Sequence, residues 1–290
     1  MLEYRDDKEF GKNKFCSDLA CERRAADTSV DGVEYKKEYS DGFVWERIRI
    51  SSQAGARSIG RPIGSYDTLN LGRAELLDSE DIDDAANEVA RELCIMLDSV
   101  RALPDRLLFV GLGNATLTPD AIGPRTAMGI NATMHLKALE RPSFSDFGCS
   151  EIAVCTPGVM AQSGMEAAEV IQGVCERIAP DAVFVIDSLA SRSPSRLGST
   201  IQISNTGIFP GSGIGNRRAP IDEALLGAPV IAIGVPTVIR ASLLVGESEK
   251  AGADDGELSK LFVSPREIDE IVNSCSKILS RGINQAFGIL

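Results

Sequence analysis

Compact apolar runs alternate with amphipathic segments along the chain from about residue 80 onward. Apolar residues recur at three- and four-residue spacing over 82–100, which predicts a helix, and helical patterns also cover about 125–139 and 165–178. Strands that alternate with helices indicate an α/β fold with a largely parallel central sheet and helices on both faces. Four apolar runs have the length of buried strands, at 107–110, 152–155, 182–186 and 229–233.

The two ends of the chain carry different patterns. The stretch to about Thr28 is polar and charge-dense without periodicity, and we expect it to form an exposed arm. Residues 32 to 71 favour strands and predict an N-terminal antiparallel β appendage. Near the other end, Ser264 as N-cap with Glu267 predicts the start of a last helix, which we expect to end at Gly282.

Composition narrows the class of protein. A chain of 290 residues with 43% hydrophobic content can bury a full core. The net charge of -12 disfavours binding to nucleic-acid backbones and anionic membrane surfaces. No apolar run approaches the roughly 20 residues that span a bilayer, and residues 1–7 lack the apolar core of a signal peptide. We therefore expect a cytoplasmic protein without direct nucleic-acid or membrane partners.

The cysteine and histidine residues of this chain do not form a pattern typical of a catalytic or metal-binding site. The cysteines are scattered without a C-x-x-C pair, which favours reduced, mostly buried thiols. His135 is the single histidine and lies in a predicted helix, where a packing or surface role is favoured over catalysis. The seven cysteines are Cys16, Cys21, Cys94, Cys149, Cys155, Cys175 and Cys275.

Aspartates follow two of the predicted strands. In open α/β sheets ligands bind beyond the carboxyl ends of the strands. Asp187 comes directly after the strand at 182–186, and Asp120 closes a glycine-containing turn after the strand at 107–110. Such a pair can hydrolyse a peptide, because one carboxylate can activate water while the other, protonated, polarises the carbonyl. Either acid could be the base, and either could equally serve as an ordinary cap.

Polar residues and a glycine-rich loop adjoin these acids. Asn114 and Ser188 could orient water or serve ordinary turn chemistry. The segment 207–218, which contains Gly213, lacks the Lys-Ser/Thr ending of a phosphate-binding loop and the G-x-G-x-x-G spacing of a dinucleotide fold. It is either a flexible surface loop or a wall that presents backbone donors to a substrate.

Several strings in fixed order resemble the germination proteases, a family of spore endopeptidases. The resemblance covers nearly the whole chain, and the family's proposed catalytic aspartates fall on Asp120 and Asp187. It implies a fold similar to that of hydrogenase maturation peptidases. The strings lie at 17–20, 110–114, 118–124, 157–160, 185–193, 200–204 and 229–238.

The resemblance also implies a biological role. An enzyme of this kind starts the degradation of small acid-soluble spore proteins during germination, in the forespore or spore core. It would be an atypical aspartic endopeptidase without a required cofactor, assembled as a homotetramer. It would be made as a zymogen, with residues 1–18 as a propeptide arm and residues 19–290 as a single catalytic domain.

The family cleaves after an acidic residue that is followed by a large apolar residue and Ala. The string Ser17-Asp18-Leu19-Ala20 has this order, so we expect the chain to cut itself between Asp18 and Leu19. Recognition of the acid requires a cationic subsite. The candidates, which flank Asp187 or close the glycine-rich loop, are Arg192, Arg196, Arg217 and Arg218.

The chain departs from the family pattern in three places. Asn205 and Phe209 stand where an Asp and a His are usual, and the stretch 239–263 is short. Two other functions fit parts of the sequence. One is a metal-assisted peptidase of the hydrogenase maturation type, with His135 as a third ligand, and the other is a noncatalytic spore protein that uses the same fold to bind a partner.

Overall fold

A computed structural model describes residues 17–23, 30–101, 105–138, 150–212, 218–244 and 255–288 of the chain. In chain order, the strands are β1 Val33–Ser40, β2 Phe43–Ile50, β3 Gly64–Asn70, β4 Arg106–Gly111, β5 Glu151–Cys155, β6 Ala182–Ser191, β7 Thr200–Ser204, β8 Val230–Arg240 and β9 Phe262–Val263. The helices are α1 Gln53–Ile59, α2 Ser79–Asp98, α3 Ile122–Met128, α4 Met134–Ala138, α5 Met160–Ser163, α6 Ala167–Ile178, α7 Glu223–Leu226, α8 Asp255–Leu258 and α9 Ile268–Phe287.

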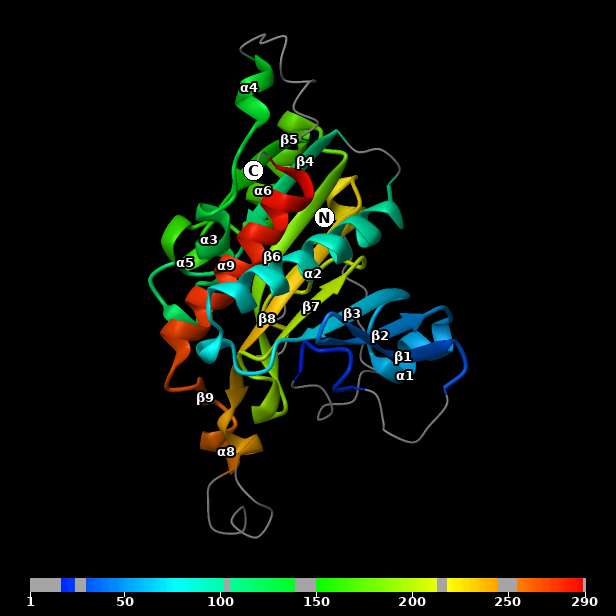
Figure 1. Cartoon of the computed structure of the whole chain (residues 1–290), viewed down its shortest axis with the longest axis vertical. Helices are drawn as coiled ribbons and strands as arrows, with labels where there is room; N and C mark the ends of the chain where they lie inside the picture. The colour runs from blue at the N-terminus through cyan, green and yellow to red at the C-terminus, as the bar shows by residue number, and fades with distance from the viewer. Residues whose placement is uncertain are drawn as a thin grey trace.

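The strands of the described residues join in one mixed sheet (Figure 1). Their order is β1-β2-β3-β7-β8-β6-β4-β5, with β9 beside β8. The strands β5, β4, β6 and β8 run parallel, whereas β1, β2, β3 and β7 join by antiparallel pairing. These findings confirm the α/β class and the antiparallel N-terminal strands. Because β3 pairs with β7, the predicted appendage is continuous with the main sheet.

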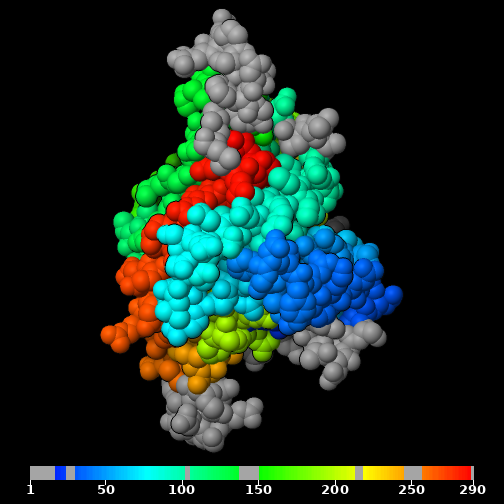
Figure 2. Space-filling model, viewed as in Figure 1, coloured from blue at the N-terminus to red at the C-terminus, as the bar shows by residue number. Residues whose placement is uncertain are grey.

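Alternate residues of β4 face two different helical layers. Leu107 and Phe109 lie in an apolar cluster with residues of α2 and α9, whereas Leu108 and Val110 lie in a second cluster with residues of α6 and α7. All four side chains are fully buried, as expected for a strand covered on both faces. Figure 2 shows α2, in cyan, on the surface between the N-terminal strands, in blue, and α9, in red and orange.

The predicted helices over 82–100 and 165–178 are confirmed as α2 and α6. Their buried apolar residues pack in the two core clusters, and their exposed positions are polar apart from Ile95 of α2 and Gly173 of α6. No helix among the described residues combines the length and the apolar character needed to cross a membrane.

The segment predicted as one helix over 125–139 forms two short helices, α3 and α4. Gly129 ends α3 where it meets α9, and a Cβ atom there would lie 2.7 Å from side-chain atoms of that helix. Thr133 then turns the chain toward β5, because its hydroxyl donates to the Ser150 carbonyl and accepts from the Ile152 amide. The single-helix prediction is wrong because these long-range contacts redirect a chain whose apolar spacing is helical.

The last helix, α9, starts and ends later than predicted. Its N-cap is Glu267, whose side chain makes no capping hydrogen bond, so the predicted capping box from Ser264 is wrong. Gly282 lies inside the helix, buried against α2, where a Cβ atom would be 2.9 Å from the Ala86 carbonyl oxygen. The absence of a side chain at Gly282 therefore permits close helix packing and does not end the helix.

The carboxyl ends of β4 and β6 meet the start of α3 by direct backbone approach. A Cβ atom at Gly123 would lie 2.3 Å from the Leu112 carbonyl oxygen and 2.5 Å from that of Ile186. A Cβ atom at Gly111 would lie 2.3 Å from the carbonyl oxygen of Gly123. These separations leave no room for a side chain, so glycine at both positions places α3 against the two strand ends.

We expect Gly123→Ala to lower the free energy of unfolding by about 1–3 kcal/mol, because the added methyl group meets backbone atoms that cannot rotate away. Gly173→Ala is the matched control. Gly173 lies inside α6 with open space around the position of its Cβ, so alanine there should stabilise the chain by about 0.5–1 kcal/mol. Urea unfolding measures both changes. Equal stability of Gly123→Ala and the wild type would contradict the close backbone approach.

Candidate active site

The two predicted aspartates lie at the same edge of the sheet. The strands β4 and β6 are parallel neighbours with Gly111 opposite Ile186, so the residues that follow this pair emerge together. Asp187 lies in β6 directly after Ile186, and Asp120 ends a 3-10 turn, Thr118–Asp120, that follows β4. Both aspartates line one cavity of about 270 Å³.

The loop between β4 and α3 fixes the Asp120 carboxylate. The backbone amide of Asn114 donates to Oδ2 of Asp120 at 2.8 Å. Gly113 has a φ of 114°, in the region that favours glycine, and a Cβ atom there would lie 2.1 Å from the Asp120 carbonyl oxygen. The Thr237 hydroxyl of β8 donates to the Pro119 carbonyl at 2.6 Å. The loop is thus held from both sides.

Asp187 is the more buried of the two acids, with 7% of its surface exposed. Its Oδ1 accepts from the Ser188 amide at 2.9 Å. Burial raises the pKa of the Asp187 carboxyl well above its usual range, and the negative charges of Asp120 and Asp18 raise it further. The Ser188 amide and the positive charge of Arg218 oppose this rise. The protonated form of Asp187 is therefore favoured.

Asp120 lies in a more polar setting and is half-buried. Burial raises the pKa of its carboxyl, while the Asn114 amide and the charge of Arg218 lower it. Neighbouring carboxyls in unequal environments titrate at different pH, and the deeper burial of Asp187 makes it the favoured holder of a shared proton. Of the two carboxyls, Asp187 therefore has the environment that favours the protonated form more strongly.

A family model of the germination proteases matches residues 13–249. The chain belongs to the germination protease family. It is therefore a protease, with a protein as its substrate. The germination proteases of Caldanaerobacter subterraneus subsp. tengcongensis and Clostridium perfringens are 37% and 36% identical to it; the first match covers 93% of both chains, and the second covers 93% of this chain and 94% of its relative.

Among solved structures, the [NiFe] hydrogenase maturation protease HycI from Thermococcus kodakarensis matches with a TM-score of 0.36 and 18% identity. The match covers 65% of this chain and 98% of that chain.

Ser188 lines the cavity, whereas the Asn114 side chain is occupied by contacts within its own loop and with α5. The Ser188 hydroxyl is buried and has no hydrogen-bond partner in the part of the chain that the structure describes. The Asn114 amide oxygen accepts from Thr116 and Gln162, and the contribution of Asn114 to the site is the backbone amide that holds Asp120.

Of the four arginines predicted to bind an acidic residue, Arg218 lines the cavity. Arg192 is exposed, and Arg196 is tied to a carboxylate of β2 by hydrogen bonds of 2.9 and 3.0 Å. The structure does not bring Arg192 or Arg196 to the cavity. Gly213 and Arg217 lie outside the described residues.

The prediction of an exposed N-terminal arm is wrong for residues 17–20, which are buried. Ser17, Leu19 and Ala20 are fully buried, and Asp18 is 9% exposed. The Asp18 amide donates to the Ala190 carbonyl at 2.8 Å, so this segment lies alongside the end of β6. Asp18 also lines the cavity with Asp120 and Asp187. The prediction fails here because composition does not reveal that the rest of the fold has pockets for these side chains.

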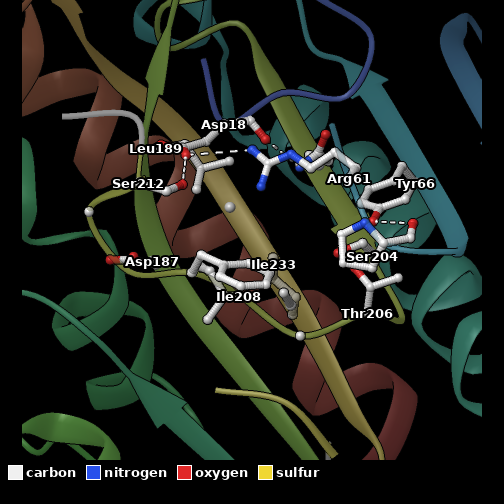
Figure 3. Close-up of a pocket in the computed structure, with 17 residues that line it drawn as sticks. Asp18, Arg61, Tyr66, Asp187, Leu189, Ser204, Thr206, Ile208, Ser212 and Ile233 are labelled. Carbon is white, nitrogen blue, oxygen red and sulfur yellow. Dashed lines mark hydrogen bonds and ion pairs between the residues drawn. The ribbon is translucent and has the colours of Figure 1, made fainter. Parts of the chain in front are cut away.

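Sequence reasoning missed three residues around this buried segment. Arg61 lies just after α1, Gln202 lies in β7, and Ser212 lies in the glycine-rich loop. Figure 3 shows the Asp18 carboxylate between Arg61 and Ser212. Gln202 belongs to a string that carries the family resemblance, and this was a usable signal. Arg61 has no comparable local signal, because its role depends on a contact with a distant part of the chain.

The remaining sequence candidates have other environments. His135 is exposed in α4. No group of three or more His, Cys, Asp or Glu side chains within the described ranges is placed to hold a metal ion. The Asn205 side chain accepts from the Ser65 amide at 2.9 Å, and Phe209 lines a pocket that also contains Asp18. The described cysteines are free thiols.

Proposed function

We propose that this chain is an endopeptidase in which Asp120 is the general base and Asp187 is the proton donor. The observation that carries the proposal is the placement of both aspartates on one cavity, with the protonated form more strongly favoured at Asp187. A charged carboxylate beside a protonated one can accept a proton from water while its neighbour gives one to the peptide carbonyl.

The proton transfers balance over one turnover. Water attacks the scissile carbonyl carbon as Asp120 takes its proton, and Asp187 gives its own proton to the carbonyl oxygen. When the C–N bond breaks, Asp120 passes its proton to the leaving nitrogen, and Asp187 recovers one from a hydroxyl of the intermediate. Both carboxyls return to their starting state. The Ser188 hydroxyl, which has no hydrogen-bond partner among the described residues and whose residue lines the cavity, supports a role in holding the water or the carbonyl oxygen.

The family resemblance and the name of the relatives support a role in spore germination. We propose small acid-soluble spore proteins as the substrate, cleaved after an acidic residue in the spore core. The chain would be a zymogen, with residues 1–18 as its propeptide and residues 19–290 as its catalytic domain. Assembly as a homotetramer stays a prediction from the resemblance.

Chelation separates this mechanism from a metal-assisted one. We expect the full chain, once it has processed itself, to cleave a small acid-soluble spore protein at the same rate with and without EDTA, and His135→Ala to leave that rate unchanged. Loss of cleavage on chelation, with recovery on adding zinc, would favour the metal-assisted peptidase. Binding of the spore protein without any cleavage would favour the noncatalytic binding protein. Cleavage is followed by gel electrophoresis and mass spectrometry of the products.

A further inference from the structure

A carboxylate-binding pocket next to the cavity is filled by the chain's own Asp18. Its Oδ1 accepts from the Ser212 hydroxyl at 2.6 Å and lies 3.5 Å from Nη2 of Arg61. Its Oδ2 accepts from the Ala190 amide at 2.9 Å. The side chains of Asp18 and Arg61 are each 11% exposed. Donors on both oxygens and a buried cation favour a charged carboxylate over a neutral side chain.

The main chain on both sides of the Asp18–Leu19 bond is also held. Nε2 of Gln202 donates to the Asp18 carbonyl at 3.3 Å, and Oε1 of Gln202 accepts from the Ala20 amide at 2.7 Å. The Asp18 amide donates to Ala190 of β6. The Gln202 side chain thus contacts the main chain on either side of Leu19, at the carbonyl of the Asp18–Leu19 bond and at the amide of the Leu19–Ala20 bond. This arrangement fixes the register of an extended segment relative to the sheet.

Each side chain after Asp18 has its own apolar surroundings. Leu19 is fully buried in the cluster that contains Val110 and Leu189. Ala20 is fully buried in a different cluster, with residues of β2 and with Tyr66. The resident segment therefore shows three neighbouring side-chain sites, which take an acid, a large apolar residue and a small residue in that order.

We propose that Arg61, Ser212 and the Ala190 amide form the subsite for the acidic side chain that precedes the scissile bond. In the full chain, Asp18 is the resident occupant of this subsite, and an acidic peptide takes its place when a substrate binds. This inference rests on the proposed function, because it assigns a specificity site beside the proposed catalytic cavity. It gives Arg61 the role that the sequence suggested for Arg192 and Arg196.

The subsite also bears on the chemistry of the aspartate pair. Three carboxyl groups converge here in a chain with a net charge of -12, so an acidic occupant needs a nearby cation. Arg61 supplies it. The negative charge of Asp18 raises the pKa of Asp187, which means that an acidic occupant favours the proton-donating form. The negative charge that the subsite recognises therefore also favours the protonated form of Asp187.

Peptide selectivity tests the subsite. The full chain, incubated until its processing is complete, is given peptides that contain Ser-Asp-Leu-Ala or the isosteric Ser-Asn-Leu-Ala. We expect kcat/KM to favour the Asp peptide about tenfold in the wild type, mainly through KM. In Arg61→Ala the two peptides should differ by less than about twofold, and Arg61→Lys should restore part of the preference. Arg192→Ala removes the same charge from an exposed position and should keep the wild-type ratio.

A second measurement does not need hydrolysis. In the full-length Asp187→Asn chain, we expect Asp18→Asn and Arg61→Ala each to speed amide hydrogen exchange at residues 17–23. Because both changes remove the same ion pair, the double variant should be faster than either single variant by less than the sum of their effects. The Arg192→Ala chain should exchange like its parent.

The two measurements separate failure of the subsite from failure of the catalytic mechanism. An unchanged Asp-over-Asn preference in an active Arg61→Ala chain, or additive effects on exchange, would overturn the subsite and leave the two-aspartate mechanism standing. Coupled exchange effects, together with a wild-type chain that hydrolyses neither peptide, would support the subsite and overturn the proposed mechanism.

Discussion

Asp187→Asn is expected to slow peptide-bond hydrolysis by about 10²–10⁴-fold while the chain stays folded. Asparagine keeps the shape of the side chain, and its amide oxygen can still accept from the Ser188 amide as Oδ1 of Asp187 does. It cannot give a proton to the scissile carbonyl. Steady-state kinetics with a peptide substrate measure the loss, and circular dichroism checks the fold.

Asp120→Asn should slow hydrolysis by a similar factor, because it removes the proposed proton acceptor where Asp187→Asn removes the proposed proton donor. Asp120→Asn keeps an acceptor for the Asn114 amide but removes the charge that takes a proton from water. Asp84→Asn is the matched control, since Asp84 is exposed on α2 away from the cavity. Full activity in either cavity variant, with an unchanged circular dichroism spectrum, would remove that aspartate from the mechanism.

The free energy of unfolding should show that the buried Asp187 carboxylate destabilises the wild type when it is charged. Asp187→Asn is the variant for this comparison. The pKa of Asp187 is raised in the folded chain, so the folded state binds its proton more tightly than the unfolded state does. The wild type therefore loses stability as the pH rises above the ordinary aspartate pKa of about 3.9 toward the raised value. The variant lacks this titration. Its free energy of unfolding relative to the wild type should increase with pH over that range, as urea unfolding at several pH values can measure.

The full wild-type chain is expected to acquire a new N-terminus at Leu19, and Asp187→Asn is expected to keep the original one. Asp18 lines the cavity with Asp120 and Asp187, and Gln202 contacts the main chain on each side of Leu19, including the carbonyl of the Asp18–Leu19 bond. The bond is thus held beside the groups proposed to cut it. N-terminal sequencing and intact mass after incubation decide between the two forms, with all-or-none cleavage as the expected difference.

Burial of the segment makes trimming by another protease a poor alternative. Leu19 is fully buried, and proteases act on accessible, extended chain. A terminus at Leu19 in both the wild type and Asp187→Asn would nevertheless show that another protease makes the cut. Asp18→Asn provides a further check, because it keeps the shape of the residue while removing the charge that Arg61 and Ser212 hold. We expect this variant to process itself more slowly than the wild type.

The central strands, the two helices α2 and α6 and the common edge of the two aspartates could be predicted from the sequence, because their signals are local. An apolar run that is buried on both faces shows as a strand wherever it lies, and helical spacing needs about a dozen residues to appear. Asp187 follows the apolar run of β6 directly, and Asp120 follows β4 after one short loop. Parallel neighbours end at the same edge, so strand order alone brings the two acids together.

The tertiary structure alone decided what surrounds the acids. Asp18 meets Ala190 across 172 residues of sequence and Ser212 across 194, and no local pattern records such contacts. For the same reason the sequence pattern predicts an exposed segment around Asp18, and it predicts a helix end at Gly282, where the structure shows close packing against α2. The preference for a proton on Asp187 also depends on burial and neighbouring charge, which exist once the chain has folded. Sequence specifies the acids, whereas three-dimensional packing sets their burial and brings Asp18 to the cavity beside them.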